Sequence, residues 1–120
     1  MTPVNLIEKW IDLLNRGDAA GCAALYAEDA SLHVAFVPPV NGRAAIQAMF
    51  EAYFAQAPLH CIVQHLYTAE GDRVVLEWKD KVGLPGINVY ELRGGLIQAQ
   101  RNYFDQLTFF KLNNLPLPKE

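Results

Sequence analysis

The chain has 120 residues, of which 52% are hydrophobic and 19% charged, and its net charge is −3. This length is typical of one domain, and so high an apolar content excludes a disordered chain. No run approaches the roughly 20 apolar residues that cross a bilayer. The mild negative charge offers no surface for nucleic acid or an anionic membrane, so we expect neither as a partner. No secretion signal opens the chain, and we expect a cytoplasmic location.

The cysteines and histidines form no motif that binds a metal. Cys22 and Cys61 are far apart in the sequence and belong to no C-x-x-C pair, which favours two buried thiols over a disulfide. His33, His60 and His65 have no close cysteine or histidine partner at metal-ligand spacing. The sequence therefore predicts no metal and no organic cofactor.

The first part of the chain predicts two helices. Thr2 is a good N-cap residue and Pro3 suits the first helical position, while apolar residues then recur at helical spacing. Gly17 can end this helix in the left-handed conformation, and Asp18 can cap a second helix over about 19–27.

A short strand and a third helix are expected next. Residues 31–37 form an extended stretch that Pro38-Pro39 ends. The third helix begins after Asn41-Gly42, and Pro58 ends it.

Beyond this point the apolar period changes from that of a helix to the period of two that is typical of strands. Short connectors that contain glycine separate the apolar runs, as in hairpins. The four runs cover residues 60–69, 73–82, 86–92 and 96–110. We therefore predict an α+β fold, in which three N-terminal helices pack on a curved, mostly antiparallel sheet. The single domain spans residues 1–120, and about 113–120 form a loose tail.

The strand period predicts which side chains face the helices. In the second run one face carries Val74, Leu76, Trp78 and Asp80. In the last run one parity carries Ile97, Ala99, Arg101, Tyr103 and Asp105, unless a bulge shifts the assignment. Asp80 and Asp105 are then acids on faces that hold little else that is polar.

Five segments, taken together, resemble a known family. In chain order they are WIDLLNRGD at 10–18, LYAEDA at 25–30, PPVNGR at 38–43 with Ile46 and Phe50 after it, GLI at 95–97, and RNYFD at 101–105. The series is similar to the SnoaL-like and limonene-epoxide-hydrolase-like members of the nuclear transport factor 2-like superfamily, which also contains ketosteroid isomerase. The resemblance implies a cone-shaped α+β fold, which hosts enzymes, binding proteins and scaffolds.

The resemblance to ketosteroid isomerase implies a general base and an oxyanion hole, but this sequence lacks the residues that form them in that enzyme. The general-base aspartate of that enzyme falls on Val34, its tyrosine on Trp10, and its oxyanion aspartate near Asn88. Valine cannot take a proton, and an indole only donates a hydrogen bond. Steroid isomerisation by that mechanism is therefore not expected.

The catalytic residues of limonene epoxide hydrolase match this sequence at more positions. Its two catalytic acids fall on Asp80 and Asp105, but its bridging arginine falls on Trp78. The tyrosine and asparagine that hold its water fall on Leu32 and Val34. The paired acids are thus kept while the groups that position them are lost.

Two carboxylates in an apolar cavity cannot easily both ionise, so such a pair supplies an acid and a base at neutral pH. We predict Asp80 and Asp105 as this pair, with Arg101 in place of the missing bridge. The alternatives are that Asp105 pairs with Arg101 or caps a turn, and that Asp80 lies in water at the end of its strand.

Aromatic and polar side chains around this pair are the candidates for binding a substrate, although an aromatic stripe also fills a core. For His33 the alternatives are a catalytic base and a structural residue. The predicted binding residues are Trp10, His33, Phe36, Phe50, Tyr53, Phe54, Trp78, Asn88 and Tyr103.

The resemblance and these residues favour a SnoaL-like enzyme (a hydrolase, isomerase or cyclase) that acts on an apolar oxygenated small molecule in a closed pocket. The alternative is a non-catalytic module that binds an apolar ligand or dimerises on the same fold. We also expect a homodimer through the outer face of the sheet, since this is common in the superfamily. The expected interface residues are Tyr67, Tyr90, Leu92 and Phe104.

Overall fold

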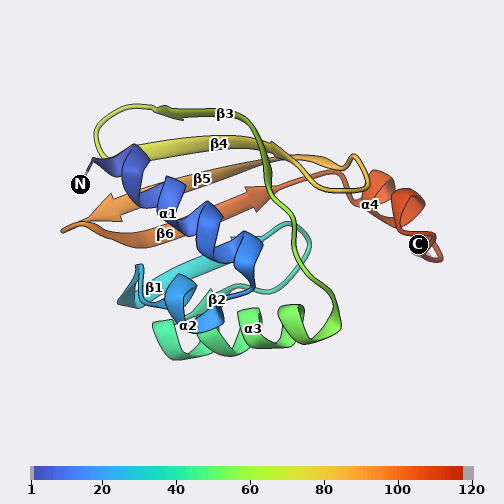
Figure 1. Cartoon of the computed structure of the whole chain (residues 1–120), viewed down its shortest axis with the longest axis horizontal. Helices are drawn as coiled ribbons and strands as arrows, with labels where there is room; N and C mark the ends of the chain where they lie inside the picture. The colour runs from blue at the N-terminus through green and yellow to red at the C-terminus, as the bar shows by residue number, and fades with distance from the viewer. Residues whose placement is uncertain (1, 118–120) are drawn as a thin grey trace.

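The computed structural model describes residues 2–117 and has an α+β architecture (Figure 1). The helices are α1 (Pro3–Arg16), α2 (Ala19–Ala23), α3 (Arg43–Gln56) and α4 (Gln106–Leu112). The strands are β1 (Tyr26–Val34), β2 (Val40–Asn41), β3 (Ile62–Thr68), β4 (Arg73–Lys79), β5 (Pro85–Arg93) and β6 (Leu96–Tyr103). They form one curved sheet in the order β2-β1-β6-β5-β4-β3, and α4 extends from its far end (Figure 1). The predicted fold class is confirmed.

Local signals set the bounds of α1. The Thr2 hydroxyl accepts a hydrogen bond from the backbone N–H of Asn5, whose side chain accepts one from the Thr2 N–H in return. Gly17 ends the helix with φ 71°, a conformation that glycine adopts without strain. The face between these caps is buried through Leu6, Ile7, Trp10, Ile11 and Leu14.

The second helix is shorter than predicted, and the strand after it is longer. α2 ends at Ala23, and β1 begins at Tyr26, where a helix to residue 27 and a strand over 31–37 were expected. Tyr26 is fully buried, and the neighbouring Leu25 carbonyl accepts a hydrogen bond from the backbone N–H of Ile97. A contact with a strand some seventy residues away therefore draws this segment into the sheet.

Strands β3 to β6 form the predicted antiparallel meander, and β1 adds a parallel pairing with β6. The last predicted run was too long, because β6 ends at Tyr103 instead of continuing to 110. Asp105 there begins α4, since its carboxylate accepts hydrogen bonds from the N–H and hydroxyl of Thr108. Residues 113–117 are exposed, and 118–120 of the predicted tail lie outside the described residues.

A β-bulge reverses the predicted faces of β6. Glu91 pairs with Ala99 but Leu92 pairs with Ile97, so Gln98 is an extra residue in β6. Beyond it the even-numbered residues face the helices, and Gln100 is buried at 1% exposure. The expectation that Arg101, Tyr103 and Asp105 share the inner face is therefore wrong.

The core lies between α1, α3 and the inner face of the sheet, which here means the face that the helices cover. It contains Ile7, Leu32, Ile46 and Leu76, each at most 1% exposed. Both cysteines are free and buried, as predicted. Within residues 2–117 no helix is long and apolar enough to span a membrane.

Candidate functional site

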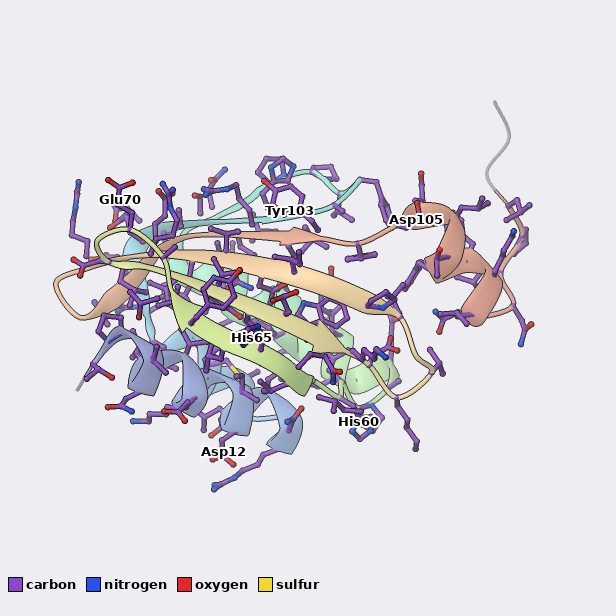
Figure 2. The ribbon with its side chains drawn as sticks, turned by 90° about the horizontal axis from the view of Figure 1, so that it is seen from above. Asp12, His60, His65, Glu70, Tyr103 and Asp105 are labelled. Carbon is purple, nitrogen blue, oxygen red and sulfur yellow. The ribbon has the colours of Figure 1, made fainter. Side chains whose placement is uncertain are left out.

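The two predicted catalytic acids are held by separate backbone groups. Oδ1 of Asp80 accepts from the N–H of Val82 at 3.0 Å and of Leu84 at 2.9 Å, which fixes the turn between β4 and β5. Asp105 is exposed at the start of α4, where Figure 2 shows it beyond the end of the sheet. The hydrogen bonds from the side chain and backbone of Thr108 lower the pKa of Asp105. The structure does not join the two acids through a shared hydrogen bond.

Arg101 does not bridge these acids, because it lies on the outer face of the sheet. Its Nη1 is 2.8 Å from Oε2 of Glu91, and Nη2 of Arg73 is 2.9 Å from the other oxygen. The two arginines lower the pKa of Glu91, and Glu91 in turn raises the pKa of Arg101. Arg101, which was predicted to bridge the two acids on the inner face, is thus paired with Glu91 on the outer face.

The inner face and helix α1, which packs on it, instead hold a row of neutral polar side chains that we call the amide row: Trp10 of α1, Tyr26 of β1, and Gln100 and Asn102 of β6. Trp10 Nε1 donates to the Tyr26 hydroxyl at 2.9 Å, and that hydroxyl donates to Oε1 of Gln100. Gln100 Nε2 donates to Oδ1 of Asn102 at 2.8 Å. Burial raises the pKa of Tyr26 well above its usual range, so its phenol stays neutral.

A second string of hydrogen bonds lies beside the amide row. Trp78 Nε1 donates to Oδ1 of Asn88 at 2.8 Å, and Nδ2 of Asn88 is 3.0 Å from the Tyr90 hydroxyl. Asn88 pairs directly with Asn102 across the two strands. Tyr90 is fully buried here, which corrects its expected place in an outer interface, and burial raises its pKa.

Aromatic side chains gather where β1, β4 and β6, which run in the same direction, all end. Ring centroids in this cluster, the aromatic rim, lie 5.3 to 6.2 Å apart. Its members are Phe36, Trp78, Phe104, Phe109 and Phe110. Phe36 is 46% exposed and has φ 52°, a strained value for a residue with a side chain.

The remaining predicted binding residues lie elsewhere. Phe50 is buried, stacks on Phe54 at 5.8 Å and approaches Tyr26, so it belongs to the core. Tyr53 is half-buried on α3. His33 is exposed and pairs with Arg101 in the sheet. Tyr103 is 52% exposed and pairs with Ile87.

An open groove of about 530 Å³ crosses the ends of β4, β5 and β6. The Trp78 ring reaches Gly86 so closely that a Cβ on this glycine would lie 2.1 Å from Cζ2 of the indole. Its lining includes Trp78, Gly86, Ile87, Tyr103 and Phe104. Among residues 2–117 no group of three or more metal-ligating side chains is arranged to hold an ion.

A model of the SnoaL-like domain matches residues 7–100. The chain belongs to the SnoaL-like family. None of the curated proteins matches it.

Solved structures of related fold are similar over nearly the whole chain. An NTF2-like protein of unknown function from Cytophaga hutchinsonii has a TM-score of 0.79 and 18% identity, over 92% of this chain and 96% of that one. A protein with a ketosteroid isomerase-like fold from Catenulispora acidiphila, in complex with trimethylamine, has a TM-score of 0.81 and 20% identity, over 97% and 96%. The epoxide hydrolase/cyclase-like enzyme SalBIII has 0.78 and 16%, over 88% and 92%. At these identities the likeness shows the fold alone.

Three polar residues of the inner face escaped the sequence reasoning: Tyr26, Gln100 and Asn102. Gln100 and Asn102 share a parity with Phe104, and this pattern was visible, but the bulge that turns it inward was not. Phe109 and Phe110 were also missed, because their helix was taken as the end of a strand.

Proposed function

We propose that the chain binds a neutral, largely apolar small molecule at the inner face of the sheet, beside the aromatic rim, without proton transfer between carboxylates. This is the binding function that the sequence left as an alternative. One observation carries it: the polar groups of the inner face are amides, phenols and indoles, whereas Asp80, Asp105 and Arg101 are engaged elsewhere.

Electrostatics favours a neutral ligand. Asn88 and Gln100 are 3% and 1% exposed, so the protein already shields the polar groups of this part of the inner face from water. A charge in such a place is costly unless an opposite charge meets it. Neutral amides can match a neutral oxygen, and the rings of the aromatic rim can pack on an apolar skeleton.

The experiment is a binding titration followed by tryptophan fluorescence, because Trp78 lies on the inner face and Trp10 of α1 is hydrogen-bonded to Tyr26 there. 1-Indanone is the neutral probe, and indane-1-carboxylate at pH 7.5 is the charged probe. We expect quenching by the ketone in the wild type and a weaker signal in Trp78→Phe, which keeps the aromatic packing. Equal affinity for the carboxylate would contradict the proposal, as would the absence of any response to the ketone.

Carboxylate acid/base catalysis is the second candidate, and the likeness in fold to SalBIII favours it. It requires one acid to stay protonated at neutral pH, whereas the Thr108 contacts favour the charged form of Asp105. Both acids must also leave the backbone groups that they cap. Turnover of a panel of epoxides and enolisable ketones by the wild type, Asp80→Asn and Asp105→Asn tests this. Turnover lost in both folded variants would favour the enzyme, and equal turnover would exclude this pair.

We further propose a homodimer through the outer face of the sheet. This face exposes Tyr67, Ile87 and Tyr103 by 41%, 42% and 52%. Light scattering at micromolar concentration should give twice the monomer mass, and Ile87→Arg should lower it. A monomeric wild type would contradict the dimer without bearing on the ligand. The cytoplasmic location stays a prediction.

A further inference from the structure

The hydrogen bonds of the amide row can run in one direction only. An indole N–H donates and cannot accept, so Trp10 must give its hydrogen to the Tyr26 oxygen. The phenol has one hydrogen of its own, and its neighbour on the other side is Oε1 of Gln100. The row therefore begins at a residue whose role as donor is fixed.

The orientation of the Gln100 amide follows from counting donors. With its amide reversed, Nε2 would face the Tyr26 oxygen, and the phenolic hydrogen would lack an acceptor at a fully buried site. In the observed orientation Tyr26 donates to Oε1, and Nε2 is free to donate to Asn102. This in turn requires Oδ1 of Asn102 to face Gln100, which leaves its Nδ2 at the end of the row.

The nitrogen of this last amide group is not fully buried. Nδ2 of Asn102 has no acceptor within residues 2–117, yet every buried side-chain nitrogen and oxygen described there has a partner. The Asn102 nitrogen therefore reaches solvent. Asn102 faces inward between Val34 of β1 and Asn88 of β5, and Phe104 of the aromatic rim follows two residues later.

We propose that Asn102 determines specificity for the bound molecule by donating a hydrogen bond from Nδ2 to an oxygen of the ligand. This inference rests on the proposed binding function. The oxygen belongs to a ketone, ether or epoxide on an apolar ring skeleton, because such groups accept and do not donate. An alcohol fits less well, since its own hydrogen needs an acceptor, and the amide oxygens of Asn88 and Asn102 each already accept one hydrogen bond and offer only their second lone pair.

Asn102→Asp reverses the polarity of this position with little change in shape. One carboxylate oxygen can still accept from Gln100, while the other presents an acceptor in place of the N–H donor. The variant should then prefer an alcohol to the corresponding ketone. Asn41→Asp makes the same change of charge at an exposed residue of β2 and serves as the matched control.

The experiment measures the affinities of 1-indanone and 1-indanol for the wild type and both variants at pH 7.5. We expect the wild type and Asn41→Asp to bind the ketone about 3- to 10-fold more tightly than the alcohol, the range of one neutral hydrogen bond. Asn102→Asp should reverse this order. The ratio of ketone affinity to alcohol affinity is compared between proteins, so the difference in hydrophobicity of the two probes drops out of the comparison. The side-chain amide resonances of Asn102 should also shift when the ketone binds to the wild type.

The outcomes separate the inference from the function on which it rests. If both probes bind and Asn102→Asp keeps the wild-type ratio, the binding function stands and the role of Asn102 is overturned. Unshifted Asn102 amide resonances in the saturated ketone complex overturn it as well, even if Asn102→Asp is too unstable to titrate. If neither probe binds to the wild type, the proposed function itself fails.

Discussion

Removing the Tyr26 hydroxyl should cost far more stability than its size suggests. Tyr26→Phe keeps the ring in place, so no large cavity forms, but it leaves Nε1 of Trp10 and Oε1 of Gln100 without partners. Both residues are buried, at 3% and 1% exposure. An unsatisfied buried group costs about 1–3 kcal/mol, so two should lower the free energy of unfolding by about 2–4 kcal/mol after some relaxation.

Tyr90→Phe is the matched control. Tyr90 is equally buried, yet its hydroxyl accepts only from Nδ2 of Asn88, so one group is left unpaired. We expect a loss of about 1–2 kcal/mol for this variant. Tyr103→Phe, at an exposed position, should change stability by less than about 0.5 kcal/mol.

Urea unfolding, followed by circular dichroism with the slope of the transition compared between proteins, measures all three losses. The order of the losses is the critical result, because the hydrogen-bond counts differ while the chemical change is the same. A Tyr26→Phe variant that is as stable as the wild type, or no less stable than Tyr90→Phe, would refute the claim that Tyr26 joins two buried groups.

Three further predictions test the rest of the structure. Gly86→Ala should lose about 1–3 kcal/mol and change the tryptophan emission, because the new methyl group would meet the Trp78 ring; unchanged emission would contradict the contact. Arg73 and Arg101 lower the pKa of Glu91, so these ion pairs stabilise the folded state at pH 7, and the stabilisation is lost as the pH falls below the usual carboxylate range. Glu91→Gln should thus cost up to about 1 kcal/mol at pH 7 and less at pH 3 in urea unfolding, and an equal loss at both pH values would count against the pairing. Burial raises the pKa of Cys22 to about 12 and of Cys61 to about 11, so a disulfide reagent at pH 8 should label them only on unfolding; rapid labelling of the native protein would show otherwise.

Helix α1 and the start of α2 could be predicted because these limits are set by neighbouring residues. Thr2 and Gly17 act on the helix that they flank, through hydrogen bonds and backbone conformation within one turn. The side chain of Asp18 caps α2 in the same way. The hairpins of the meander also follow from local signals, such as Gly94-Gly95 with positive φ at both residues.

The elements that were misjudged depend on distant contacts. β1 begins early because Leu25 and Tyr26 meet β6, and a helical spacing of small residues before them conceals this. The start of α4 is local, since Asp105 caps it, but an acid in a family motif was given a catalytic role instead. Asp80 and Asp105 show that an N-cap or turn residue and a catalytic acid look alike in one sequence.

The bulge at Gln98 matters most, because it connects the register of one strand to the chemistry of the site. Without it Arg101 would face the helices, where a guanidinium needs a buried acid, and Gln100 would face out. With it Arg101 meets Glu91 on the exposed face, and the amides of Gln100 and Asn102 line the buried one. One residue in β6 therefore separates a charged inner face, which would suit proton transfer, from a neutral one, which suits the recognition of a neutral oxygen.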